Sequence, residues 1–178
     1  MKKKIALLTV VLIVAMVVLG GSMTAYAGHQ CSVTVIIGDV NLDGSVDSID
    51  LALLYNTTYY AVPLPNRLQY IAADVNYDSS CTMLDFYMLE DYLLGRISSF
   101  PAGQTYTVYY GDLNGEQLVT TTDQSLLSDY LLGRINLTFR QYVSADVNGD
   151  GTVDGIDLAI ITAYINGQIQ HFPVCPQS

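Results

Sequence analysis

The chain has 178 residues, of which 51% are hydrophobic and 13% are charged, with 17 acidic residues against seven basic ones. This composition excludes an intrinsically disordered protein, which would combine low hydrophobicity with high charge. The net charge of −10 excludes a protein that binds nucleic acids or anionic membranes through a basic surface, because a polyanionic surface repels phosphate.

The N-terminal segment predicts a secretory signal peptide over residues 1–27. Lysines at residues 2–4 precede an apolar run at residues 5–19, and the Ala-Tyr-Ala sequence at residues 25–27 suits a cleavage site. After cleavage, 17 acids would face four arginines, so the net charge would be about −13. We therefore expect a secreted, extracellular protein without a membrane attachment. An uncleaved anchor is the alternative, since the apolar run approaches the length of a membrane span.

A twelve-residue acidic pattern, Asp-x-Asn-x-acid-x6-Asp, occurs four times, beginning at residues 39, 74, 112 and 146. Such a loop is typical of a calcium site, because Ca²⁺ takes six to eight oxygen ligands and alternate side chains of a sharp turn can supply them. An ordinary acidic turn is the alternative, but four copies in register favour calcium. The predicted ligands, including a backbone oxygen at position 7, are Asp39, Asn41, Asp43, Ser45, Asp47, Asp50, Asp74, Asn76, Asp78, Ser80, Asp85, Asp112, Asn114, Glu116, Leu118, Asp123, Asp146, Asn148, Asp150, Thr152, Asp154 and Asp157.

Position 6 of each loop separates the four copies into two classes. The turn is expected to need a positive φ there, which glycine adopts freely and other residues adopt at a cost of about 1 kcal/mol or more. Gly44 and Gly151 meet this requirement, whereas Ser79 and Gln117 occupy the same position in the other two loops. We expect up to four calcium ions, with tighter binding at loops 39–50 and 146–157.

Apolar residues recur at helical spacing after every loop and predict an amphipathic helix there. The identical heptapeptides at residues 91–97 and 129–135 contain a glycine that predicts a helix end. By contrast, residues 31–37 and 104–110 are β-branched and aromatic without a helical stripe, so the entering helix of an ordinary EF-hand is missing. The expected fold class is all-α.

Several of these segments together resemble type I dockerins. They are Gly-Asp-Val-Asn-Leu-Asp-Gly at residues 38–44, Tyr-Gly-Asp-Leu-Asn at residues 110–114, the two Ala-Asp-Val-Asn stretches, and the Phe-Pro pairs at residues 100–101 and 172–173. A dockerin is a pair of calcium loop-helix "F-hand" repeats. The resemblance implies two modules in tandem, at residues 28–101 (loops 39–50 and 74–85) and residues 102–178 (loops 112–123 and 146–157).

The resemblance further implies binding to cohesin modules of scaffolding proteins in a cellulosome, the extracellular complex that degrades plant polysaccharide. The chain would then be a monomeric, non-catalytic adaptor that links or caps scaffold cohesins. In dockerins, recognition falls largely on loop positions 10 and 11 and helix positions 17 and 18, and plain helix surface is the alternative for each. Carried across, these residues are Ser48, Ile49, Tyr55, Asn56, Met83, Leu84, Glu90, Asp91, Thr121, Thr122, Ser128, Asp129, Gly155, Ile156, Thr162 and Ala163. None is basic, unlike in many dockerins.

Other function classes have weaker support in the sequence. We expect no enzyme, because the two histidines lie at opposite ends of the mature chain and nothing beyond two modules is large enough for a catalytic domain. A calcium-stabilised carbohydrate-binding protein is one alternative, since Tyr59-Tyr60 and Tyr109-Tyr110 could stack on sugars. A calcium buffer is another, although millimolar extracellular calcium would keep such sites filled.

Three cysteines in a secreted chain permit one disulfide and one free thiol. Cys81 lies at loop position 8, where an inward side chain is expected, and this favours a buried free thiol. Pairing of Cys31 with Cys175 requires the two modules to fold back on each other, and the sequence leaves that question open. Since each module repeats a whole unit of two loops and two helices, we expect neither to need the other for its core.

Overall fold

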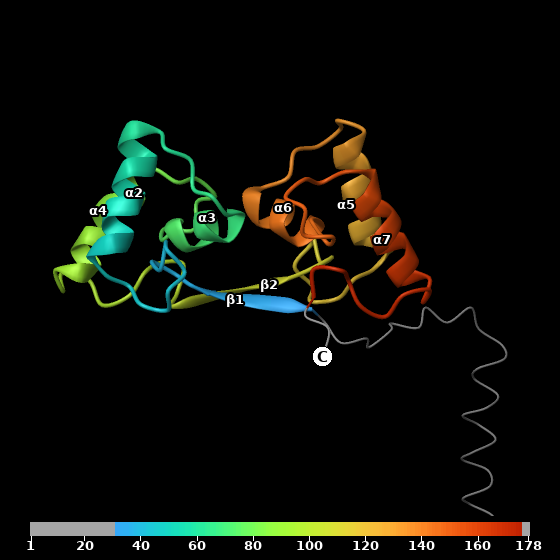
Figure 1. Cartoon of the computed structure of the whole chain (residues 1–178), viewed down its shortest axis with the longest axis horizontal. Coiled ribbons are helices and arrows are strands. Elements are labelled where there is room, and N and C mark those ends of the chain that lie inside the picture. Colours follow the sequence, from blue (N-terminus) through green and yellow to red (C-terminus); the bar gives the residue numbers. More distant parts are fainter. Residues whose placement is uncertain (1–30, 176–178) are drawn as a thin grey trace, which may run out of the picture.

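The computed structural model describes residues 31–175, and the predicted signal peptide lies outside them. In this range six helices form two modules that lie side by side, and a two-stranded sheet runs along one edge of both (Figure 1). The expected helical class is confirmed, with the small sheet as an addition. The elements are β1 (Ser32–Ile36), α2 (Ser48–Tyr60), α3 (Arg67–Ala73), α4 (Met83–Leu93), β2 (Thr105–Tyr109), α5 (Thr121–Leu131), α6 (Phe139–Ala145) and α7 (Gly155–Ile165).

Each long helix begins inside an acidic loop, because the residue at loop position 9 caps the helix and the loop's last aspartate is the third helical residue. In α2, the side chain of Asp47 accepts a hydrogen bond from the backbone N–H of Ile49, and Asp50 accepts one from the backbone N–H of Asp47. This reciprocal capping box satisfies N–H groups that the first turn leaves without helical partners. The same box starts α4, α5 and α7, so loop and helix form one unit.

The short helices α3 and α6 were not predicted, and they fix the geometry between the two loops of each module. Each has a capping box with glutamine as its third residue, and that glutamine also reaches the first loop of its own module. Gln69 donates to the carbonyl of Val40 at 2.7 Å, and Gln141 donates to the carbonyl of Leu113 at 3.0 Å. The short helices thus bind the two loops of a module together.

The two long helices of each module pack side by side in opposite directions. The hydroxyl of Thr58, near the end of α2, contacts the sulfur of Met83 at the start of α4. Leu54 and Leu89 are fully buried in this module, as Leu127 is in the second. Truncation of such a leucine to alanine costs about 2–5 kcal/mol.

The sheet relates the two modules by an approximate two-fold symmetry. Strands β1 and β2 are antiparallel, with Thr34 opposite Thr107 and their hydroxyl oxygens 3.1 Å apart. These two threonines are equivalent positions, since each lies five residues before the first loop of its module. The modules therefore meet as the subunits of a symmetric dimer do, through the same surface on both sides.

The modules also share a hydrophobic core, so the expectation of independent cores is wrong. Val108 and Val143 of the second module are buried in the cluster that contains Leu54 and Leu89 of the first. The partly buried Tyr110 packs against the clusters of both modules. The sequence repeat could not reveal this sharing, because the contacts join residues that are far apart in the chain.

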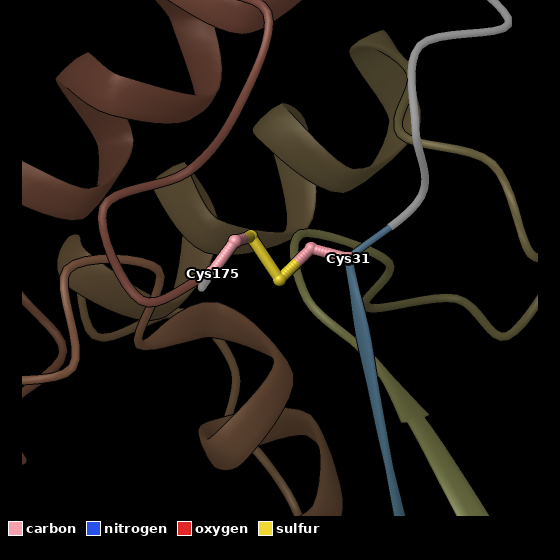
Figure 2. The surroundings of a disulfide bond; sticks show 2 residues. All are labelled: Cys31 and Cys175. Atoms are coloured by element: carbon pink, nitrogen blue, oxygen red, sulfur yellow. A yellow bond between two sulfur atoms is a disulfide. The ribbon is translucent and has the colours of Figure 1, made fainter. Parts of the chain in front are cut away.

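A disulfide closes the structure at the edge of the sheet (Figure 2). It joins Cys31, directly before β1, to Cys175 near the end of the second module, with their Cα atoms 5.8 Å apart. The two modules do fold back on each other, which settles the alternative that the sequence left open. Cys81 is a free thiol, as predicted, but it is only partly buried against the first core. None of the helices within residues 31–175 is long and apolar enough to cross a membrane.

Candidate calcium loops and partner-binding faces

The first acidic loop holds its two end carboxylates with its own backbone. The two oxygens of Asp39, at position 1, accept hydrogen bonds from the N–H groups of positions 5 and 6 at 3.0 and 2.9 Å. The oxygens of Asp50, at position 12, accept from positions 3 and 9 at 2.9 and 2.8 Å. Both carboxylates are buried, with 3% and 0% of their surface exposed. The loop therefore fixes two carboxylates side by side inside the protein.

The other three loops repeat this arrangement. In each, the carboxylate at position 1 accepts the N–H of position 6, and the carboxylate at position 12 accepts the N–H of positions 3 and 9. The positive φ predicted at position 6 is confirmed in all four copies, at 95° and 85° for Gly44 and Gly151, and 65° and 62° for Ser79 and Gln117. Serine and glutamine thus adopt a conformation that favours glycine.

The burial of these carboxylates fits a bound cation. All four aspartates at position 12 are fully buried, and an unpaired buried charge is strongly disfavoured. Burial raises the pKa of Asp50, Asp85 and Asp157 above the ordinary value, and the neighbouring loop aspartates add repulsion. A divalent cation would offset both effects. Carboxylate, amide and backbone oxygens are the donors that calcium prefers.

Carboxylates alone do not form the predicted sites. Among residues 31–175, no group of three or more Asp, Glu, His or Cys side chains is gathered as a metal cluster. Each predicted site therefore depends on its asparagine at position 3 and its backbone oxygen at position 7 as well. The position-9 residues Asp47 and Asp154 lie at the loop edge, where each caps the following helix.

The loop at residues 112–123 departs from the others at position 5. In the other three loops the asparagine at position 3 donates to the aspartate at position 5, at 2.7–2.8 Å. Glu116 replaces that aspartate here, and the buried side-chain nitrogen of Asn114 has no hydrogen-bond partner within residues 31–175. The third loop thus differs from the first and fourth at two positions, with a glutamate at position 5 and the non-glycine residue Gln117 at position 6.

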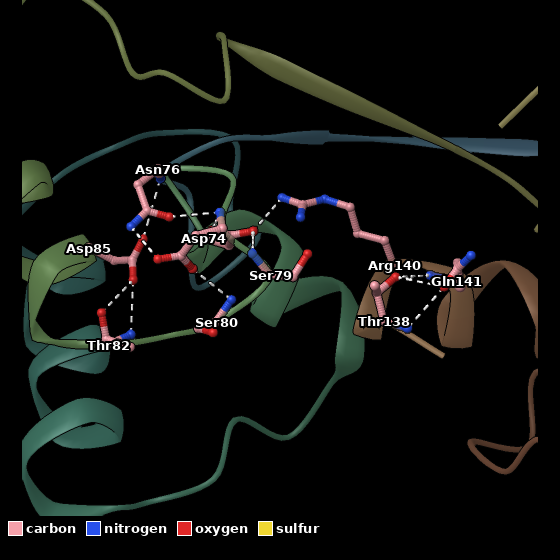
Figure 3. A network of polar contacts seen from close by, with 10 residues as sticks. Asp74, Asn76, Ser79, Ser80, Thr82, Asp85, Thr138, Arg140 and Gln141 are labelled. Atoms are coloured by element: carbon pink, nitrogen blue, oxygen red, sulfur yellow. Dashed lines mark hydrogen bonds and ion pairs between the residues drawn. The ribbon is translucent and has the colours of Figure 1, made fainter. Parts of the chain in front are cut away.

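The loop at residues 74–85 forms an ion pair with the other module. Asp74, fully buried at position 1, forms an ion pair with Arg140 of helix α6, with 2.6 Å between the carboxylate oxygen and the guanidinium nitrogen (Figure 3). Sequence analysis missed this arginine, since no local motif marks it.

The predicted recognition residues of each module gather on its pair of long helices. Because the helices run in opposite directions, the first turn of one lies beside the later turns of the other. One end of the first module's face carries Ser48, Ile49, Glu90 and Asp91, and the other carries Tyr55, Asn56, Met83 and Leu84. In the second module, Thr121 and Thr122 lie with Thr162 and Ala163, and Gly155 and Ile156 with Ser128 and Asp129.

These predicted contact residues differ in their exposure and in whether they already have hydrogen-bond or ion-pair partners. Ile49, Leu84 and Ile156 are 54–56% exposed, so each side chain is accessible to a partner. Others already have partners within their module. The hydroxyl of Thr162 accepts a hydrogen bond from Gln124 at 2.8 Å, and Asp129 pairs with the arginine that follows its helix.

The surface chemistry of the two faces also differs. On the first module, Tyr55, Tyr59, Tyr60, Phe86 and Tyr87 form a chain of ring contacts over α2 and α4. On the second module, a shallow hollow of about 480 Å³ lies between α5 and α7. The hollow is lined mainly by polar side chains, including those of Ser128, Asp129 and Thr162.

The two long-helix faces lie at opposite ends of the molecule. Figure 1 shows α2 and α4 at one end and α5 and α7 at the other, with α3, α6 and the sheet between them. The contacts between modules join β1 to β2 and α3 to α6. A cleft of about 710 Å³ between the modules is bordered by Arg67 and by loop residues Asp146 and Asp150, and not by the predicted recognition residues.

Comparison with known proteins gives a family match and two similar solved structures. The sequence matches the family model "Dockerin type I domain" at residues 37–94 and 110–166. Two structures of the ScaB dockerin from Acetivibrio cellulolyticus, carrying a mutation in its N-terminal or its C-terminal helix and in complex with the third cohesin ScaC, are each 37% identical in sequence. They cover 37% and 38% of this chain, and 92% and 96% of the dockerin chains, with TM-scores of 0.35 and 0.36. A search of curated proteins found no significant match.

Proposed function

The chain belongs to the type I dockerin family, and from this membership we propose that it is a secreted, non-catalytic, calcium-dependent adaptor that binds two cohesin modules in a cellulosome. Both family matches are dockerin domains, which are non-catalytic and belong to extracellular cellulosome components. The resemblance predicted from the loop motifs is thereby confirmed. The domain limits 28–101 and 102–178, and the cleavage after residue 27, are part of this proposal.

The observation that carries the proposal is the position of the two long-helix faces at opposite ends of the molecule (Figure 1). The modules contact each other through α3, α6 and the strands, so docking leaves both faces exposed. A partner on one end then does not obstruct a partner on the other. A rigid spacing between two sites favours bridging of two scaffold components over capping of one.

The calcium part of the proposal assigns the residues at positions 1, 3, 5, 7 and 12 of every loop as ligands, and those at position 9 in the first and fourth loops. Calcium would supply the positive charge that the buried carboxylates need, and so would hold loop and helix together. Since the last loop aspartate is also the third residue of the following long helix and completes its capping box, the ion would fix the start of each recognition face. Calcium binding and cohesin binding are therefore expected to be coupled.

The different chemistry of the two faces leads us to expect different cohesin preferences. The first face offers an aromatic and apolar end around Tyr55 and Leu84, whereas the second offers hydroxyl groups around Ser128 and Thr162. A partner that buries apolar surface gains affinity from the first face, and a partner with hydrogen-bonding groups gains it from the second.

A matched pair of variants tests the proposal. Leu84 and Ile156 both occupy loop position 11, are 54% and 56% exposed, and lie on different modules. Leu84→Arg should abolish cohesin capture by the first face, and Ile156→Arg by the second, without loss of folding. The test is capture of a panel of cohesins by each variant in calcium. Failure of both the unmodified chain and the variants to capture any cohesin would contradict the proposal.

Carbohydrate binding is the second candidate, supported by the exposed tyrosines of the first module. Tyr59 and Tyr60 are 62% and 61% exposed, and exposed aromatic rings can stack on sugars. Tyr109 and Tyr110 are half-buried, which leaves less of each ring free. Sedimentation with insoluble cellulose, before and after Tyr59→Ala and Tyr60→Ala, separates this function from cohesin capture.

A further inference from the structure

Arg140 places a buried positive charge of the second module against a calcium loop of the first. Its side chain is 7% exposed and extends from α6 to Asp74, which is fully buried at position 1 of loop 74–85 (Figure 3). The carboxylate oxygen that it contacts also accepts the N–H of Ser79, at loop position 6. The 2.6 Å contact is an ion pair whose N–H direction does not meet hydrogen-bond geometry.

Aromatic rings enclose the remainder of the guanidinium group. Its central carbon lies 4.0 Å from the ring centre of Tyr77, 4.9 Å from that of Phe139 and 5.0 Å from that of Tyr106. The other two guanidinium nitrogens have no hydrogen-bond partner among the described residues. The charge is thus desolvated and held in place, so its field at the loop is weakly screened.

Loop 74–85 is the loop that receives such a charge. Within residues 31–175, no ion pair reaches Asp39, Asp112 or Asp146, which occupy position 1 in the other loops. Leu68 holds the place in the first module that Arg140 holds in the second, since both directly precede the glutamine that contacts the first loop. The approximate symmetry of the modules is therefore broken at this contact.

We propose that Arg140 is a built-in counter-ion for loop 74–85, which lowers the calcium affinity of that loop and links it to the docking of the two modules. The proposal rests on the proposed calcium sites and not on cohesin binding. Two effects of the guanidinium both lower the calcium affinity of this loop. The guanidinium satisfies Asp74 when calcium is absent, and its charge repels a calcium ion when one binds. Linkage then requires that calcium in this loop weakens the Arg140 contact, while the sheet and the disulfide keep the modules joined.

The test is a calcium titration of residues 28–178, followed by amide NMR at loop position 6. In every loop this N–H donates to the aspartate at position 1, so Gly44, Ser79, Gln117 and Gly151 report on their own loops. Arg140→Met should lower the calcium concentration at the midpoint of the Ser79 response by about tenfold or more, because it removes a nearby desolvated charge. The Gly44 and Gly151 midpoints should not move.

Arg67→Met is the matched control. Arg67 also lies between the modules, where it stacks on Tyr142 at 3.8 Å, but it forms no ion pair among the described residues. Its replacement should leave the Ser79 midpoint unchanged. At a calcium concentration that fills the loops of Gly44 and Gly151 but neither of the other two, hydrogen exchange of the Ser79 amide in the unmodified chain should be slower than that of Gln117, another non-glycine position 6. Arg140→Met should remove this difference.

Several outcomes would overturn the proposal. An unchanged or raised Ser79 midpoint in Arg140→Met would show that the arginine does not oppose calcium there. Equal shifts at all four amides would indicate a general loss of stability. If Arg140→Met does not fold, the unmodified chain still tests the proposal. The proposal requires that the midpoint of the Ser79 response lies at a higher calcium concentration than that of Gln117. If no position-6 amide responds to calcium, the calcium sites themselves are wrong, independently of cohesin capture.

Discussion

Removal of the Cys31–Cys175 disulfide is expected to destabilise the whole described fold, and not only its ends. The bond joins β1 at the start of the first module to the last part of the second, across a sequence separation of 144 residues. Replacement of both cysteines by alanine removes this constraint. Because the modules share a sheet and a core, we expect them to lose stability together.

The magnitude follows from the length of the closed loop. A crosslink stabilises a protein mainly by restricting the unfolded chain, and a loop of this length corresponds to about 5 kcal/mol by chain entropy. Measured values are commonly lower, since unfolded chains retain some structure. We expect a loss of at least about 2 kcal/mol.

Urea unfolding in saturating calcium, followed by circular dichroism, measures this loss. Cys81→Ala is the control, because it removes a cysteine that forms no disulfide. The reasoning is refuted if the double variant loses less than about 1 kcal/mol, or no more than the control does. Separate unfolding transitions for the two modules in the crosslinked chain would contradict the shared core.

Three further predictions concern the metal, the backbone and the free thiol. Excess EDTA should remove most helix content at 25 °C, because each long helix starts at a carboxylate that calcium would hold; retained helix content and melting temperature would contradict this expectation. Gly111→Ala should lower the free energy of unfolding by several kcal/mol, since its φ is +83° and an added Cβ would lie 2.7 Å from the Phe172 ring. Gly115→Ala should lower it by only about 1 kcal/mol, because its φ is +81° but the added Cβ meets free space. Equal urea midpoints for the two variants would refute this ranking. Burial raises the pKa of the Cys81 thiol to about 12. Iodoacetamide at pH 9 should therefore alkylate the folded chain at least about a hundredfold more slowly than the urea-unfolded chain, as measured by mass spectrometry. Similar rates would show that the thiol is accessible and ionised.

Local features of the fold were readable from the sequence. The positions of the four loops, the long helices after them and the positive φ at position 6 all follow from residues close in the chain. The short helices α3 and α6 were missed, although their capping boxes, from Asn66 to Gln69 and from Thr138 to Gln141, are a sequence signal that could have located them.

Contacts between the modules were not readable. The pairing of Thr34 with Thr107 and the contact of Arg140 with Asp74 join residues 73 and 66 positions apart, and no periodicity records them. The β-branched segments at residues 31–37 and 104–110 indicated only that no helix enters those loops. Whether Cys31 pairs with Cys175 depended on the same docking of the modules, so the sequence alone could not answer that question.

The central claim, that one chain holds two cohesins at once, is tested most directly by the binding ratio. Isothermal titration of residues 28–178 with a cognate cohesin in calcium, beside Leu84→Arg and Ile156→Arg, measures this ratio. Two different cohesins are titrated in turn if the faces differ in preference. The account predicts a total of two cohesins per unmodified chain and one for each variant. A total of one for the unmodified chain, when each variant still binds one, would show that the two faces cannot be occupied together and would contradict the account.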